Sequence, residues 1–416
     1  MTRLETQGLA AKNAERRLMT ATMAEKNTAL LAMAQAIVAR RDEWLAANAE
    51  DMKAAKRAGM REALLDRLAL DEKRINAIAE GVRQVAALPD PVGQVVSSTL
   101  RPNGLRIERR RVPLGVVGII YEARPNVTVD AAALCLKSGN AVLLRGGKEA
   151  FRSNKAVTAI LRDALEEAGL PRDCIALVED TSRQSAQEMM DLTGYLDVLI
   201  PRGGAGLIRT VAQNSHVPVI RTGEGVCHVY VHAGADLDSA ARILYNAKCS
   251  RPSVCNAAEC VLVDRAVAQK FLPMAWEYLK KKNVLIHGGA EVCAILGDKA
   301  VPATAEDWDM EYGDYQLAAH VVTGIEEAMD FIAVHGTGHS EAIITNDYAA
   351  AQTFLDGVDA AAVYVNASTR FTDGFEFGLG AEIGISTQKL HARGPMGLEE
   401  LTATKYVVYG SGQVRE

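Results

Sequence analysis

The chain has 416 residues, which is enough for two or three domains. Hydrophobic residues make up 49%, charged residues 24%, and the net charge is −6, so the composition is that of an ordinary globular protein without the basic character of nucleic-acid binders. No apolar run has the length of a membrane span or the pattern of a signal peptide, and the seven cysteines lack CxxC spacing. We therefore expect a cytoplasmic protein with neither membrane nor nucleic acid as its partner.

The first part of the chain reads as helix. Residues 4–88 are rich in alanine, place apolar residues at spacings of three and four, and contain no proline before Pro89. Residues 95–111 follow as two alternating arms around a Pro-Asn-Gly turn, which predicts a β-hairpin. The exposed face of such a hairpin can serve an oligomer.

From residue 116 onward, short apolar runs alternate with helical stretches. The runs of the first series span residues 116–125, 141–147, 174–180 and 196–204. A second series lies between residues 260 and 368, and residues 405–412 form a late strand that can return to the hairpin. This alternation predicts an α/β fold with parallel sheets covered by helices, and ligands are then expected at the carboxyl ends of the strands.

Two glycine turns are candidates for binding a phosphate. Both follow a predicted strand and open a helix, where backbone N–H groups face outward. Their residues are Arg145, Gly146, Gly147 and Lys148 in the first turn, and Arg202, Gly203 and Gly204 in the second. Neither has the GxGxxG or GxxxxGK[ST] pattern, and ordinary turn chemistry explains glycine pairs equally well.

Among the cysteines, Cys255 lies in a polar, proline-containing loop before a strand, so we expect an accessible thiol that can act as a nucleophile. Cys135 and Cys260 lie in apolar patterns and are expected to be packed. His335 and His339 are four residues apart, but the glycines around them do not suit a helical metal site, so we expect turn histidines and no metal.

Several long stretches resemble a known family. They span residues 121–150, 200–209, 249–259, 333–341 and 365–402. All of them resemble the γ-glutamyl phosphate reductases (glutamate-5-semialdehyde dehydrogenases), which belong to the aldehyde dehydrogenase superfamily, and the likeness runs from about residue 5 to residue 412. The resemblance implies an aldehyde dehydrogenase-like fold in three parts. These are a Rossmann-like cofactor-binding domain (1–94 and 112–249), a catalytic domain (250–390) and an oligomerisation element (95–111 and 391–416).

The resemblance also implies an activity. It would be the NADPH-dependent reduction of L-glutamyl 5-phosphate to L-glutamate 5-semialdehyde with release of phosphate, a step of proline biosynthesis. Cys255 takes the nucleophile's position and would form a thioester that hydride then reduces. Lys148 and Arg202 favour NADPH over NADH, because they can meet a 2′-phosphate. The implied partners are further copies of the chain and a glutamate kinase that passes on the labile acyl phosphate.

Other residues acquire roles from the same resemblance. Asn126 is the candidate donor to the oxyanion, and Glu311 resembles the glutamate that holds the nicotinamide ribose. Substrate contacts are expected from the loop residues Ser368, Thr369 and Arg370. Arg221 stands where hydrolytic relatives carry a water-activating glutamate, so Arg221 or Arg124 is a candidate for the leaving phosphate, with structural ion pairs as the alternative.

Two other functions remain open at this point. One is a coenzyme-A-acylating aldehyde dehydrogenase of the same fold, which would depend on coenzyme A instead of phosphate. The other is an inactive α/β scaffold that binds partners through its hairpin, and an accessible Cys255 argues against it.

Overall fold

The computed structural model describes residues 1–122 and 124–415, and it divides into two compact units. The first unit contains residues 1–222, 378–384 and 396–416, and the second contains residues 223–377 and 385–395. Across the described ranges, no helix is both long and apolar enough to cross a membrane.

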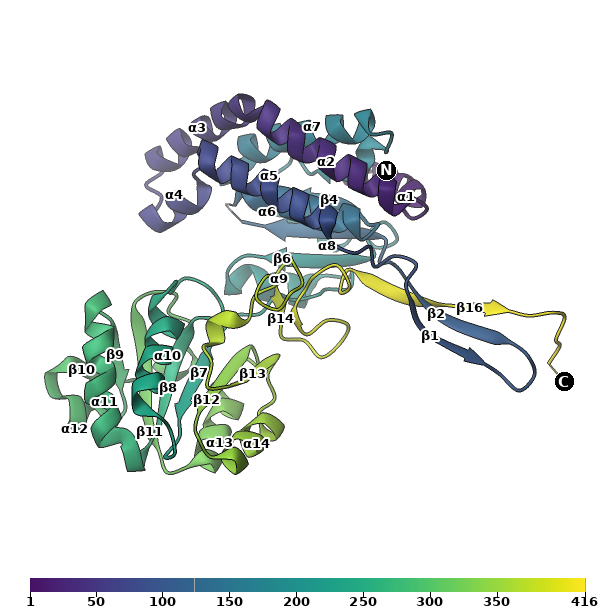
Figure 1. The fold of residues 1–416 in the computed structure, drawn as a ribbon. Coiled ribbons are helices and arrows are strands. Elements are labelled where there is room, and N and C mark those ends of the chain that lie inside the picture. The colour runs from purple at the N-terminus through teal and green to yellow at the C-terminus, as the bar shows by residue number, and fades with distance from the viewer. Residues whose placement is uncertain (123, 416) are drawn as a thin grey trace. The chain divides into compact units, whose positions relative to one another are not determined.

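Five helices open the first unit, as the helical pattern of residues 4–88 predicts. They are α1 (Arg3–Leu18), α2 (Met23–Ala39), α3 (Arg41–Arg57), α4 (Glu62–Leu68) and α5 (Glu72–Ala87). The start of α1 and the start of α2 are each fixed by a capping box, in which Thr2 pairs with Glu5 and Thr22 with Glu25. These helices lie over the sheet of the first unit (Figure 1).

The sheet of this unit has four parallel strands in the order β5-β4-β3-β6. They are β3 (Val116–Tyr121), β4 (Ala141–Arg145), β5 (Ile175–Leu177) and β6 (Val198–Arg202). The connecting elements are α6 (Pro125–Lys137), η1 (Lys148–Ala150), α7 (Phe151–Glu167), η2 (Arg172–Cys174), α8 (Arg183–Met190) and α9 (Ala205–Asn214). The chain builds outward from β3 to β5 and then crosses back to β6, so the strand order reverses between β3 and β6. That reversal is where open α/β sheets bind ligands.

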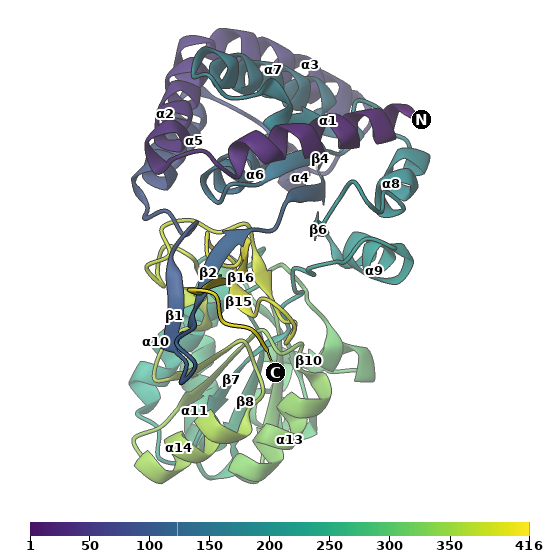
Figure 2. The same ribbon diagram turned by 90° about the vertical axis from the view of Figure 1, so that its right-hand side faces the viewer.

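A three-stranded antiparallel sheet completes the first unit. Its strands are β1 (Val95–Leu100), β2 (Arg106–Pro113) and β16 (Thr402–Tyr409), in the order β1-β2-β16. The predicted return of the C-terminal strand to the hairpin is therefore confirmed, and Figure 2 shows the three strands side by side. Leu100, Tyr406 and Val408 are exposed on this sheet. Its use as a surface for an oligomer stays a prediction.

The second unit is built on seven parallel strands in the order β10-β9-β11-β8-β7-β12-β13. They are β7 (Cys227–Val231), β8 (Ala258–Asp264), β9 (Leu285–Gly288), β10 (Ala300–Pro302), β11 (Gln316–Val322), β12 (Ser340–Ile344) and β13 (Ala362–Val365). The helices are α10 (Leu237–Cys249), α11 (Arg265–Leu279), α12 (Ala290–Leu296), α13 (Ile325–His335) and α14 (Tyr348–Gly357). Short 3₁₀ turns lie at η3 (Lys280–Lys282), η4 (Gly297–Lys299), η5 (Ala305–Asp309) and η6 (Thr369–Phe371), and β14 (Ile385–Ser386) pairs with β15 (Gly394–Pro395).

The predicted domains differ from the two units at three places, one of which is that residues 378–384, predicted in the catalytic domain, belong to the first unit. The sequence places residues up to 249 with the cofactor-binding domain, but β7 lies between β8 and β12 in the sheet of the second unit. The second unit accordingly begins at residue 223, because β7 and α10 complete its core. Residues 391–395 also belong to the second unit and not to the C-terminal strand of the oligomerisation element, because β15 pairs with β14 there.

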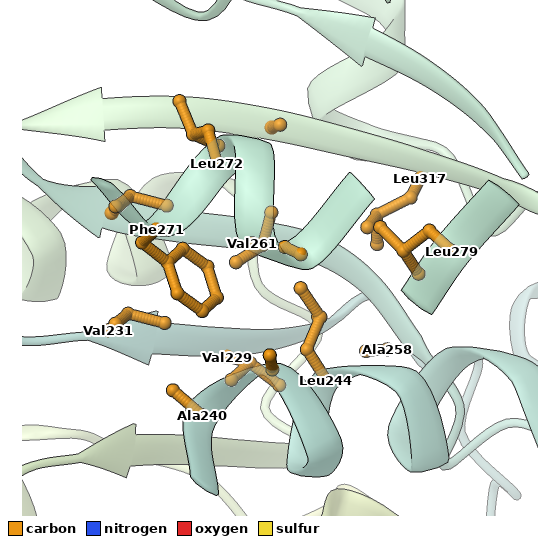
Figure 3. Close-up of a cluster of buried hydrophobic side chains, with 14 of the residues drawn as sticks. Val229, Val231, Ala240, Leu244, Ala258, Val261, Phe271, Leu272, Leu279 and Leu317 are labelled. Atoms are coloured by element: carbon orange, nitrogen blue, oxygen red, sulfur yellow. The ribbon is translucent and has the colours of Figure 1, made fainter. Parts of the chain in front are cut away.

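The core of the second unit holds the ends of its strands in place. Phe271 and Leu244 pack from α11 and α10 against Val229 and Val261 of neighbouring strands (Figure 3). Each of these side chains is at least 98% buried, and burying one contributes about 1.5–3 kcal/mol. The loops that lead into β7 and β8 are therefore anchored where they join these strands.

Candidate active site

Cys255 lies in the loop between α10 and β8 and is partly exposed, whereas Cys135 and Cys260 are buried as predicted. Its position differs from the general expectation for parallel sheets. The thiol precedes β8, so it lies at the amino end of this sheet, where β7 and β12 also begin. The loops that surround it are those that enter strands, and not those that leave them.

The carbonyl group of Cys255 is held by the turn before β7. A Cβ atom at Gly225 would lie 1.5 Å from the carbonyl oxygen of Cys255, so only glycine fits there. The thiol of Cys227 also donates to this oxygen, at 3.3 Å. The backbone of the nucleophile is thus in direct contact with the 223–227 segment.

Asn256, which follows the nucleophile, is 4% exposed and ties the loop to residues 369–372. Its Nδ2 donates to the carbonyl oxygens of Thr372 at 2.9 Å and Arg370 at 3.3 Å. Its own carbonyl oxygen accepts from the hydroxyl of Thr369 at 2.7 Å, and its Oδ1 accepts from the guanidinium of Arg370. Nearly every polar group of Asn256 is therefore engaged with this one segment.

The three predicted substrate contacts differ in what they can still do. Ser368 and Thr369 are buried, and their hydroxyl groups are already engaged. The Ser368 hydroxyl accepts from the backbone N–H of Arg370 at 3.3 Å, and the Thr369 hydroxyl donates to the carbonyl oxygen of Asn256. Arg370 is partly exposed, and its Nε donates to the hydroxyl of Ser250 at 3.1 Å. It is the residue of the three that brings a charge to the surface of the loop.

A buried polar chain supports the same loops. His339 Nδ1 lies 2.8 Å from the Ser340 hydroxyl and 3.7 Å from the Cys227 sulfur, and the Ser340 hydroxyl lies 2.6 Å from that of Thr372. Burial lowers the pKa of His339 to about 4, so the imidazole is neutral at pH 7. His335, which ends α13, instead bonds to Asp309 at 2.8 Å. The described residues contain no group of three or more possible metal ligands.

Glu311 lies beside the turn that contacts Cys255. Burial raises the pKa of its carboxyl group, the N–H of Gly225 donates to it and lowers that pKa, and Glu224 raises it further. Under this region Lys248 and Glu259 form a buried ion pair at 2.6 Å. Glu311, which is predicted to contact the nicotinamide ribose, and Cys255 thus both contact Gly225.

The predicted pyrophosphate turn lies at the point of strand reversal in the first unit. Arg202 ends β6, and Gly203 and Gly204 lead into α9. The N–H of Gly204 already donates to a carboxylate oxygen of Glu122 at 3.0 Å, and a Cβ at Gly203 would lie 2.7 Å from the carboxyl carbon. The turn thus already binds one anionic group, the carboxylate of Glu122, and its contact with a pyrophosphate stays a prediction.

The other predicted glycine turn divides into structural and exposed residues. Arg145 donates to the carbonyl oxygens of Thr181 and Ser182 at 2.7 and 2.8 Å, and burial lowers its pKa. Gly146 is needed for space, because a Cβ there would lie 2.2 Å from the side-chain amide of Asn154. After Gly147, Lys148 is exposed at the start of η1, so it is the residue of this turn that is accessible to a 2′-phosphate.

The remaining candidates belong to the first unit. Asn126 lies in the first turn of α6, where its Nδ2 donates to Asp130 at 3.0 Å, and burial raises the pKa of Asp130 to about 6. Arg124 precedes α6, and Arg221 precedes the boundary between the units. The roles of these three residues in the reaction stay predictions.

Sequence reasoning overlooked Gly225, Asn256 and Glu122. Gly225 contacts Cys255 across 30 positions, Asn256 contacts Arg370 across 114 positions, and Glu122 contacts Gly204 across 82 positions. The only signal in the sequence was the direct adjacency of Asn256 to Cys255.

Comparisons with known proteins identify the family and the fold. The profile of the aldehyde dehydrogenase family matches residues 5–290. A γ-glutamyl phosphate reductase of Moorella thermoacetica is 59% identical over 413 residues and one of Ligilactobacillus salivarius is 57% identical over 413 residues, each match covering 99% of both chains. The crystal structure of γ-glutamyl phosphate reductase from Thermotoga maritima superposes with a TM-score of 0.98 at 49% identity and covers 100% of both chains.

Proposed function

This chain belongs to the γ-glutamyl phosphate reductases of the aldehyde dehydrogenase family, and we propose that it reduces L-glutamyl 5-phosphate through a thioester on Cys255 with NADPH as reductant. The observation that carries the proposal is the partly exposed Cys255, whose backbone is held by Gly225 and whose neighbour Asn256 is held by residues 369–372. A nucleophile needs this combination of access and fixed position.

The chain's own residues account for the first half of the reaction. The thiolate of Cys255 attacks the acyl carbon, a C–S bond forms, and the C–O bond to phosphate breaks with its electron pair leaving on phosphate. When NADPH is bound, it supplies the hydride that reduces the thioester, and breaking of the C–S bond then returns the thiolate and releases the aldehyde.

The turns that support a cofactor are those of the first unit. The turn of Gly203 and Gly204 would receive the pyrophosphate at the start of α9, and exposed Lys148 together with Arg202 would favour NADPH over NADH. Glu311 would hold the nicotinamide ribose. The product places the enzyme in proline biosynthesis, and association with glutamate kinase and with further copies of the chain remains part of the proposal.

The test is reduction of NADP⁺ by glutamate 5-semialdehyde in the presence of phosphate. Cys255→Ala should abolish the phosphate-dependent reaction, and Cys293→Ala is the matched control because Cys293 is also partly exposed. Activity retained in Cys255→Ala, or lost equally in Cys293→Ala, would refute the assignment of the nucleophile.

The same assay separates the coenzyme-A-acylating alternative. We expect activity with phosphate or arsenate and none when coenzyme A replaces them, and the reverse pattern would contradict the proposed reaction. Replacing Arg124 or Arg221 with methionine should raise the Michaelis constant for phosphate specifically. Unchanged kinetics would remove that arginine from the substrate-binding set.

A further inference from the structure

The guanidinium of Arg370 joins the two ends of the nucleophile loop. Its Nε donates to the hydroxyl of Ser250 at 3.1 Å, and its Nη1 donates to the side-chain oxygen of Asn256. Ser250 and Asn256 lie on either side of Cys255 in the sequence, so the arginine spans the loop that presents the thiol. Its placement follows from these contacts and from the side-chain-to-backbone hydrogen bonds between Asn256 and residues 369–372.

These two hydrogen-bond partners are uncharged, so neither neutralises the guanidinium. Burial, and then the positive charge of Arg251, lower the pKa of Arg370, while Asp373 and Cys255 raise it. A half-buried cation with uncharged partners is stabilised by an anion nearby. Electrostatic coupling is reciprocal, so the guanidinium of Arg370 stabilises the thiolate of Cys255 by the same free energy by which the thiolate stabilises the guanidinium.

We propose that Arg370 supplies the positive charge that favours the thiolate form of Cys255, and that Asn256 is the positioning residue that holds this charge at the loop. The proposal rests on the function above only in taking Cys255 as the nucleophile. A cation beside a cysteine is one of the established ways to obtain a reactive thiolate.

Two further charged groups act on Arg370. Arg251 is exposed and lowers the pKa of Arg370, whereas Asp373 raises it. From the strands behind, burial raises the pKa of the Cys227 thiol and lowers that of His339, so both are neutral at pH 7.

Acidic groups act on the residues behind the loop. Glu341 and Glu259 act on Cys227, and Glu224 acts on Glu311. Burial raises the pKa of Glu311 and Glu341, and that of Glu259 to about 7, and Glu259 is paired with Lys248. Because they are carboxyl groups, none of them can supply a positive charge.

The test is the pH dependence of Cys255 alkylation by iodoacetamide, followed by mass spectrometry of the peptide, in the full chain without substrate or cofactor. The reagent is uncharged, so the arginine does not attract it. Arg370→Met should move the midpoint of the profile upward by about one pH unit, which is roughly tenfold slower alkylation below that midpoint. Arg370→Lys should restore most of the shift because it keeps the charge. Asn256→Ala should give a smaller upward shift.

Arg265→Met is the matched control, because Arg265 is an arginine of the same unit that pairs with Glu291 at 2.7 Å away from the loop, and its profile should equal that of the wild type. If Arg370→Met does not fold, as judged by its thermal transition, Arg370→Gln removes the charge while keeping a hydrogen-bond donor. An unchanged alkylation midpoint in the folded neutral variant would overturn the proposal. If the Michaelis constant for phosphate rises in that variant while the midpoint stays unchanged, the arginine binds the substrate anion and does not act on the thiol. If the wild-type enzyme shows no phosphate-dependent reaction although Arg370→Met shifts the alkylation midpoint, the result counts against the proposed function alone.

Discussion

Replacing Gly225 with alanine tests how closely the nucleophile loop depends on its neighbour. The added Cβ would lie 1.5 Å from the carbonyl oxygen, 2.5 Å from the carbonyl carbon and 3.1 Å from the Cα of Cys255. Ordinary contact for such a carbon begins at 3.4 Å, and the atoms in the way are backbone atoms that no rotamer change can move aside. The two segments must therefore separate by close to 2 Å at this point.

A displacement of about 1 Å at a reacting group can reduce the rate by roughly 100-fold, so we expect kcat of Gly225→Ala to fall by at least that factor. Steady-state reduction of NADP⁺ with phosphate and glutamate semialdehyde measures it, and the thermal transition shows whether the variant is folded. Gly234→Ala is the control in the same unit, because its Cβ would meet neighbours only at 3.4 Å and beyond. A folded Gly225→Ala enzyme with wild-type kcat would refute the claim that this contact positions Cys255.

Three further predictions follow from individual contacts. Glu122→Gln should lower the dissociation constant of NADPH roughly fivefold, because a negatively charged group no longer competes with the cofactor phosphate for the N–H of Gly204. Fluorescence titration measures the constant, and an equal or weaker affinity would contradict the role of this turn. His339 has a folded pKa of about 4, below its ordinary value of 6.5, so the unfolded chain takes up the proton first and its contribution to stability falls as the pH drops from 6.5 through 4. This group should remove about 2 kcal/mol of unfolding free energy between pH 7 and pH 5, and His339→Gln should flatten that dependence in urea unfolding; an equal slope would exclude it as the cause. Gly81→Ala in α5 meets no atom within 4 Å and should stabilise the first unit by about 0.5–1 kcal/mol, seen as a higher thermal midpoint; a lower midpoint would show a contact that the structure lacks.

The candidate site shows where sequence reasoning succeeds and where it stops. The chemical character of Cys255 is local, since a polar loop before an apolar strand predicts an accessible thiol, and the thiol is partly exposed. The expectation that chemistry lies at the carboxyl ends of strands does not describe this thiol, because Cys255 precedes β8. The functional value of Ser368 and Thr369 was also difficult to judge, since their hydroxyls are used to hold the loop itself.

The α/β class, the helical first part and the hairpin could be predicted from periodicity and from runs of neighbouring residues, which are local properties. The loop of Cys255 made it a candidate nucleophile, and the resemblance of the surrounding motif to a known family singled it out. Three features became visible only in the folded chain: β7 belongs to the second unit, Gly225 contacts the carbonyl group of Cys255, and Arg370 contacts the loop from 114 positions beyond Asn256. Such contacts depend on the order in which strands pair, and a single chain's pattern of apolar and polar residues does not encode that order. The accessible cysteine could thus be read from its own loop, whereas the groups that hold and charge it come from elsewhere in the fold.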